Sequence, residues 1–270
     1  MKKGMGILIF FTFLVFLNES CKKQNSTQNG GTDVPVFNYG DSIFYQRNQS
    51  QDYIITPTNN STGTGKYLSF PDGLVIDGNT GAINVSKSET GLKYAIAFIP
   101  DQKKDTLLSF ITISGINYLD GFYILTGPDS IASSIYNAVP GIVIPGLNNG
   151  SAFDVGSNCN SQGCAVNINN GTINLAETVR NGVFGSTPSN NDRHEFEMTY
   201  QINDNSNGST NKLKVKLYYF NTMSDVTQEA YDIINSRTGS IIGASNTVPT
   251  FAFSSSTVKP RPPCIFIVGH

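Results

Sequence analysis

Two stretches in which apolar and polar residues alternate strictly place the strongest constraint on the fold of this chain. Residues 195–202 read EFEMTYQI, and residues 212–219 read KLKVKLYY. Successive side chains of a strand point to opposite faces of a sheet, so each stretch predicts a half-buried strand. The polar segment 203–211 predicts the loop that joins them into a hairpin. One face of this hairpin is apolar, and glutamates oppose lysines on the other.

The rest of the chain also favours strands. Its apolar residues are largely isoleucine, valine, phenylalanine and tyrosine, which suit a pleated sheet. Further strands are predicted at 94–99 (YAIAFI) and 107–113 (LLSFITI). One helix is expected from Ser224 to Ser236, where Asp225 would cap the first turn and Gln228 would complete a capping box. The pattern predicts an all-β protein with one short helix.

The amino terminus has the features of an export signal. Lys2 and Lys3 precede an apolar run at 7–17, and a short polar segment leads to Cys21. This run is too short to cross a bilayer, which needs about 20 apolar residues. The residues L-N-E-S-C resemble the lipobox of bacterial lipoproteins, in the lax form typical of Bacteroidetes. The resemblance implies a signal peptide at 1–20, acylation of Cys21 (palmitate) and anchoring in the outer membrane; an ordinary secretory signal is the alternative.

The segment 21–33 is polar and without periodicity, which predicts a flexible tether. Beyond it, residues 71–83 spell P-x-G-L-x-I-x-x-x-T-G-x-I, and G-x-x-Y follows at 91–94. This motif resembles the hairpin of bacterial immunoglobulin-like and cadherin-like domains. The resemblance implies that Leu74, Ile76 and Ile83 point into a sandwich and that residues 77–79 turn the chain.

The motif occurs once in this reading, so it defines only the first of two domains. We expect an immunoglobulin-like β-sandwich at 34–116 and a second antiparallel β-sandwich, of unknown type and carrying the helix, at 117–270. In the second, further strands are expected at 247–253 and 264–268, with the proline-rich residues 259–263 as a connector. Domains of the resembled family serve mostly as spacers and adhesive modules of surface proteins.

The cysteines suit an oxidising compartment. Cys159 and Cys164 are spaced to close a small disulfide loop. A zinc site is disfavoured because this pair lacks a second ligand pair and the chain has only His194 and His270 as histidines. Cys264 lies in the apolar run CIFIV and is expected to be a buried small hydrophobe.

Catalytic motifs are missing from the sequence. It contains no G-x-S-x-G, no H-E-x-x-H and no glycine-rich phosphate loop that opens a helix. Glu195 and Glu197 are explained by the sheet pattern, and His194 is expected at the surface. Asp72 and Asp77 flank a turn and lack the ligand count of a calcium loop. We therefore expect no enzyme activity, no cofactor and no metal site.

Charged residues make up 14% of the chain and the net charge is −2, which disfavours nucleic-acid binding. The favoured function is a noncatalytic, membrane-anchored surface lipoprotein for adhesion or partner binding. Its partners would be the membrane, through the lipid, and another surface protein or a glycan; which membrane face it occupies stays open.

One alternative is a glycan-binding lipoprotein of a nutrient-uptake system, and a divergent hydrolase is a third reading. In the glycan alternative, aromatic rings would stack on sugars. The available rings are Tyr118, Phe122, Tyr123, Tyr218, Tyr219 and Phe220.

Overall fold

Strands dominate the structure, which is a computed structural model. It describes residues 37–58, 63–102, 106–126, 130–237 and 262–270. The segment Pro35–His270 forms one compact unit, to which the following description applies. The predicted all-β class is confirmed.

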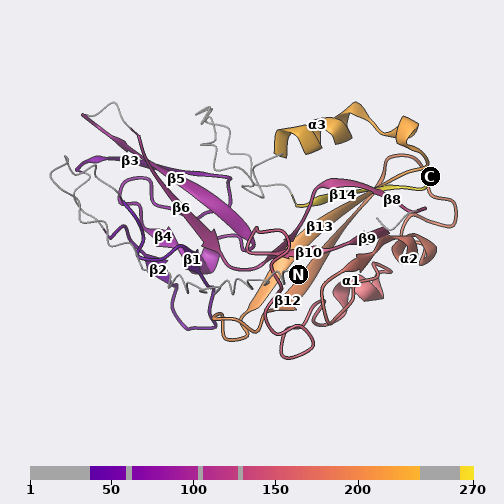
Figure 1. The fold of residues 1–270 in the computed structure, drawn as a ribbon, viewed down its shortest axis with the longest axis horizontal. Helices are drawn as coiled ribbons and strands as arrows, with labels where there is room; N and C mark the ends of the chain where they lie inside the picture. Colours follow the sequence, from indigo (N-terminus) through magenta and orange to yellow (C-terminus); the bar gives the residue numbers. More distant parts are fainter. Residues whose placement is uncertain (1–36, 59–62, 103–105, 127–129, 238–261) are drawn as a thin grey trace, which may run out of the picture. The chain divides into compact units, whose positions relative to one another are not determined.

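The first half of this unit is built on a four-stranded sheet (Figure 1). Its strand order is β1 (Ile43–Phe44), β6 (Leu107–Ile113), β5 (Leu92–Pro100) and β3 (Gly65–Phe70). β5 pairs antiparallel with both neighbours, whereas β1 runs parallel to β6. The strands predicted at 94–99 and 107–113 are thus confirmed.

A short strand pair, β2 (Ile54–Ile55) with β4 (Ile83–Asn84), accompanies this sheet. Leu74 and Ile83 are buried in the core with the inner faces of β5 and β6, and Ile76 packs against that core. This is the inward orientation that the motif predicted.

The second half is built on a sheet of β12 (Asp192–Gln201), β13 (Thr210–Phe220), β14 (Cys264–Val268) and β8 (Gly121–Ile124), in that order. The predicted hairpin is confirmed, because Glu195 lies opposite Lys216 and Glu197 opposite Lys214. The sheet is mixed rather than purely antiparallel, since β14 is parallel to both β13 and β8. The predicted strand at 264–268 is β14, and the one at 247–253 lies outside the described residues.

Two short pairs complete the strands. β7 (Ile116–Tyr118) pairs with β10 (Ser134–Tyr136), and β9 (Ile131–Ala132) pairs with β11 (Ile173–Asn174).

Helices cover both faces of the second sheet (Figure 1). α3 (Gln228–Arg237) packs on the face that carries Tyr218, Phe220 and Phe266. α1 (Asn158–Ser161) and α2 (Leu175–Arg180) contribute to the core on the opposite face. Burial on both faces explains why β14 is apolar throughout instead of alternating.

The predicted helix start was wrong. α3 begins at Gln228, and a separate 3-10 turn, η4 (Met223–Asp225), precedes it. The carboxylate of Asp225 accepts hydrogen bonds from the backbone N–H and the hydroxyl of Thr222, at 3.0 and 2.7 Å. Asp225 therefore closes the capping box of the short turn and does not cap the helix.

One local motif occurs twice, at residues 75–88 and 165–178. The two copies align without a gap, and the contacts described below recur at corresponding positions. Each copy makes an isolated bridge, Ile76 with Ile83 and Val166 with Ile173. In each, a glycine with positive φ follows the turn: Gly81 at 71° and Gly171 at 70°. A Cβ at either position would clash with an aromatic ring, so the conformation and the packing both require glycine.

The helical end of the motif is repeated as well. The side chain of Asn84 caps η2 (Val85–Lys87), and that of Asn174 caps α2 in the same way. The hydroxyl of Ser88 donates to Asn84 O, and that of Thr178 donates to Asn174 O. The sequence motif at 71–83 thus occurs once, but its turn and its cap recur at 165–178. The copy at 165–178 retains the glycine, the second isoleucine and the capping asparagine but lacks the G-L and T-G pairs that made the first recognisable.

Candidate binding groove

A groove of about 460 Å³ lies beside the start of β13, and we call it the β13 groove. One wall consists of residues 210–214 of β13, and the other of residues 86–90 together with Leu92. Gln46, Asn117, Glu197 and residues 262–263 complete the lining. Its size falls within the range of about 300–1,000 Å³ that ligand pockets occupy.

The β13 groove follows a strand edge. Adjacent side chains of a strand point to opposite faces, yet all five consecutive residues 210–214 line the groove. A groove that runs along the edge of the strand accounts for this lining. β12 pairs with β13 along Thr210–Tyr219, whereas β14 pairs only with Lys216–Phe220, so no strand of the described residues pairs with the edge opposite β12 before Lys216.

The direction of the main-chain groups on this edge follows from neighbouring bonds. Lys216 N donates to Pro263 O at 2.9 Å, so even-numbered residues of β13 direct their N–H and C=O away from β12. On β12, Gln201 and Thr199 instead bond to Ala152 and Val155 on its far side, which agrees with this alternation. The main-chain groups of Lys212 and Lys214 therefore face the β13 groove, without a partner among the described residues.

A buried polar atom without a partner also belongs to the β13 groove. The side chain of Asn211 is 5% exposed, and its Nδ2 donates to Ser209 O at 3.3 Å. Its Oδ1 accepts no hydrogen bond, and among the described residues it is the one buried side-chain polar atom in this state. Leaving such an acceptor unpaired costs roughly 1–3 kcal/mol. Asn211 also lines the β13 groove, so its amide lies beside the space that a ligand would fill.

Asn117 supplies a second buried amide. It is 4% exposed, and its Oδ1 accepts a hydrogen bond from Tyr118 N at 2.8 Å. This contact occupies the acceptor of Asn117, whereas the acceptor of Asn211 has no partner.

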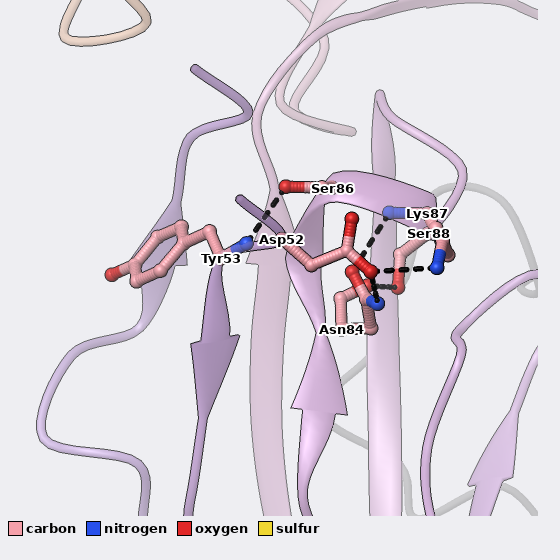
Figure 2. Close-up of polar contacts among 6 residues, drawn as sticks. All are labelled: Asp52, Tyr53, Asn84, Ser86, Lys87 and Ser88. Carbon is pink, nitrogen blue, oxygen red and sulfur yellow. Dashed lines mark hydrogen bonds and ion pairs between the residues drawn. The ribbon is translucent and has the colours of Figure 1, made fainter. Parts of the chain in front are cut away.

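The opposite wall is held by polar contacts around η2 (Figure 2). Asp52 accepts hydrogen bonds from Asn84 Nδ2 at 2.8 Å and pairs with Lys87 Nζ at 2.6 Å. The bond from Lys87, followed by that from Asn84, lowers the pKa of the Asp52 carboxyl. Tyr53 N donates to the hydroxyl of Ser86 at 2.9 Å. Because these bonds cross between segments distant in sequence, residues 86–88 have a defined position.

A buried tyrosine joins the two walls. The hydroxyls of Tyr200 and Thr90 lie 2.8 Å apart, and Ile116 N donates to Tyr200 Oη at 3.2 Å. Burial raises the pKa of Tyr200 to about 12. Gly91 lies at φ +74°, and a Cβ there would sit 2.2 Å from Ile116 O. Glycine is thus required for this close approach of the two segments.

The charged side chains near the β13 groove are paired on the outer face of the sheet. Lys212 Nζ lies 2.6 Å from Glu197 Oε1, and Lys214 Nζ lies 3.0 Å from Glu195 Oε1. Glu195 and Glu197 thus occupy the ladder of ion pairs that the sequence pattern suggested. His194 Nε2 lies 3.9 Å from Asp192 Oδ1, and its ring contacts Phe184 edge-on.

The predicted disulfide is not formed in the structure, where Cys159 and Cys164 are free, buried thiols. Cys164 N donates to Cys159 O at 3.0 Å, so the backbone holds the two residues close together. Burial is the main cause that raises the pKa of both thiols, that of Cys164 to about 12. The Asp154 carboxylate accepts from Cys159 N and from Asn160, and thereby fixes this turn. Whether the bond forms on export stays a prediction.

Cys264 is 1% exposed, as expected of a buried hydrophobe. Cys21, the predicted acylation site, lies outside the described residues.

Among the described residues no helix has both the length and the apolar character needed to cross a bilayer. They also contain no group of three His, Cys, Asp or Glu side chains that could hold a metal ion.

The aromatic residues considered for sugar stacking form no exposed row. Tyr118, Tyr218, Tyr219 and Phe220 are buried in the cores on the two faces of the sheet. Phe122 contacts the rings of Tyr231 and Phe266, and Tyr123 packs against the core. None of these rings lines the β13 groove.

Sequence reasoning did not find the β13 groove. The available signal was the pair Pro262–Pro263 immediately before an apolar strand. Proline has no N–H to donate to a ladder, so strand pairing ends there and the neighbouring edge is left open. Which strand lies next to β14 is a matter of topology and could not be read from the sequence.

Neither a protein-family model nor a curated protein matches this chain. Among solved structures, the EC1-2 segment of human protocadherin-24 matches with 10% identity and a TM-score of 0.23, over 68% of this chain and 96% of that one. Drosophila N-cadherin EC1-4 matches with 12% identity and a TM-score of 0.20, over 69% of this chain and 50% of that one.

A tri-modular GH5 (subfamily 4) endo-beta-1,4-glucanase from Bacillus licheniformis matches with 13% identity and a TM-score of 0.21, over 68% of this chain and 38% of that one. At such TM-scores these similarities carry no argument about this chain.

Proposed function

We propose that this chain is a noncatalytic surface lipoprotein, anchored in the outer membrane through acyl chains on Cys21, that binds a partner in the β13 groove. The observation that carries the binding function is that the β13 groove is lined by Asn211, a buried residue whose Oδ1 has no hydrogen-bond partner. A buried acceptor that costs free energy in the unbound protein is explained if a ligand satisfies it.

The anchor is supported by the sequence alone. The positive start, the apolar run at 7–17 and the residues L-N-E-S-C resemble a lipoprotein signal peptide at 1–20, directly before Cys21. More than one acyl chain is needed for stable anchoring, because a single chain gives only marginal binding. The polar segment 21–33 would then tether the folded part to the membrane surface.

The anchor is tested by fractionating cells that express the wild type or Cys21→Ala. We expect the wild type in the outer-membrane fraction, with an N-terminal mass that shows an acylated Cys21. The Cys21→Ala variant should lose both properties. An unmodified N-terminus in the wild type, or a variant that still partitions with membranes, would refute the anchor.

The binding function is tested separately by site-specific photo-crosslinking in intact cells. The photo-reactive residue is placed at Thr210, in the β13 groove, and as a control at Arg180, which is exposed on α2 away from it. We expect a discrete crosslinked product from position 210 alone, which a co-introduced Asn211→Leu weakens. Equal crosslinking at both positions would show that the β13 groove has no binding role.

A further inference from the structure

We infer that the occupant of the β13 groove is an extended peptide segment of a partner protein, which adds to the free edge of β13 as an extra strand. This inference deepens the proposed binding function and rests on it. It begins with the length of edge that β14 leaves uncovered, residues 210–214.

The edge offers the hydrogen-bonding pattern of a strand. Lys212 and Lys214 each direct one N–H and one C=O into the β13 groove, as the bond from Lys216 N to Pro263 O establishes. Residues two apart in a strand are separated by about 6.6–6.8 Å. Alternating donors and acceptors at this spacing are complementary to another strand, and recognition by strand addition derives its affinity from such main-chain bonds.

The described part of β14 begins at this place. β14 is parallel to β13 and reaches it at Cys264, opposite Lys216, directly after Pro262 and Pro263. These prolines have no N–H, so the described end of β14 cannot extend the ladder towards Lys214. An incoming strand would therefore bind beside Lys212 and Lys214, next to the described end of β14.

The side chains around the edge predict the sequence pattern of the peptide. On the inner face of β13, Asn211 and Leu213 face the β13 groove together with Leu92 of the opposite wall. On the outer face, Lys212 and Lys214 form ion pairs with glutamates. A bound peptide should therefore alternate small apolar or amide side chains, directed inward, with polar ones directed outward.

A peptide fits the β13 groove better than a sugar does. The described lining contains no aromatic ring on which a sugar could stack. The amides of Asn211 and Asn117, which both line the groove, are complementary to peptide groups, because an amide can both accept from N–H and donate to C=O. The main-chain edge would bind these groups of a peptide in register, whereas a sugar presents no such repeat.

The test uses the mature chain, residues 21–270, and two probes: an array of random peptides of about ten residues and a glycan array. For peptides that bind, amide hydrogen exchange is measured residue by residue with and without peptide. We expect exchange at Lys212 and Lys214 to slow at least about tenfold on binding, with little change at Lys66 on β3. Protection of both amides before any peptide is added would show that the chain covers its own edge, and would overturn the inference.

A matched pair of variants separates the contribution of the main chain to peptide binding from that of the Lys212 side chain. Lys212→Pro removes the N–H that faces the β13 groove, which is not used in the ladder with β12, and should weaken peptide binding by about tenfold. Lys212→Ala keeps the N–H but loses the ion pair with Glu197, and a loss of about twofold is expected. Equal losses in the two variants would show that the side chain, not the strand edge, recognises the peptide. If Lys212→Pro does not fold, the exchange measurement still decides.

The arrays separate the two proposals. Glycans that bind while peptides do not, with crosslinking at Thr210 retained, would overturn the strand-addition inference and leave the binding function standing. No binding to either array, together with no specific crosslink at Thr210, would overturn both.

Discussion

Replacing Asn211 with leucine should stabilise the unbound protein, although the substitution is made in a buried position. Asn211 is 5% exposed and retains one contact, the 3.3 Å bond from its Nδ2 to Ser209 O. Its Oδ1 is buried without a partner. Leucine has a similar shape, makes apolar contacts and leaves no such acceptor.

Two opposing terms set the size of the effect. Removing the unpaired buried oxygen recovers roughly 1–3 kcal/mol. Losing the long bond to Ser209 O costs at the low end of the range of about 0.5–1.5 kcal/mol for a hydrogen bond. The expected gain in the free energy of unfolding is therefore about 1 kcal/mol, which for a folded part of this size raises Tm by about 2–4 °C.

Asn117→Leu is the matched control for this measurement. Asn117 is equally buried, but its Oδ1 accepts the 2.8 Å hydrogen bond from Tyr118 N. Its replacement should lower the free energy of unfolding by about 1–2 kcal/mol, because a buried N–H then loses its acceptor. Urea unfolding of both variants and the wild type provides the comparison. A destabilisation of Asn211→Leu equal to that of Asn117→Leu would refute the argument from the unpaired oxygen.

Two further predictions concern the turn motif and the cysteines. Hydrogen bonds from Thr80 N, from the Thr80 hydroxyl and from Asn79 N lower the pKa of the Asp77 carboxyl. The ionised carboxylate therefore stabilises the fold above its unfolded pKa of about 3.9. This contribution to stability is lost as the pH falls through the folded pKa. Asp77→Asn should therefore weaken the dependence of stability on pH below about pH 4, measured by urea unfolding. The turn should be kept, because the second copy of the motif uses Asn167 in the same role. An unchanged loss of stability between pH 4 and lower pH would contradict this. For the cysteines, thiol labelling of the unfolded but unreduced exported protein should detect Cys264 alone if Cys159 and Cys164 are bridged, and three reactive thiols would reject the bridge.

Local patterns in the sequence determined a large part of this fold. The alternation at 195–202 and 212–219 predicted both strands and their pairing as a hairpin, since it gives each strand one apolar face and one charged face of complementary sign. The signal at 71–83 predicted a turn whose apolar residues enter the core, and the run at 264–268 predicted a strand. These features depend on residues close in sequence, where periodicity and turn preferences act directly.

Other features depended on which segments meet in space. The mixed sheet arises because β14 lies beside β13 and β8, and a parallel neighbour has no local signature in the sequence. The start of α3 at Gln228 depends on Asp225 bonding to Thr222 instead of to the helix. The repeated turn motif is recognised by the hydrogen bonds that both copies share. Its sequence does not reveal the repeat, because these bonds are kept although most of the side chains differ.

The candidate site depends entirely on contacts between segments that are distant in sequence. Asn211 lies at the end of a polar loop in the sequence, and nothing there distinguishes its amide from the neighbouring asparagines. It is buried beside Tyr200, its cross-strand partner on β12, and its Oδ1 has no partner among the described residues. An unmet hydrogen bond is a property of everything that surrounds an atom, so it exists only once distant segments have been brought together.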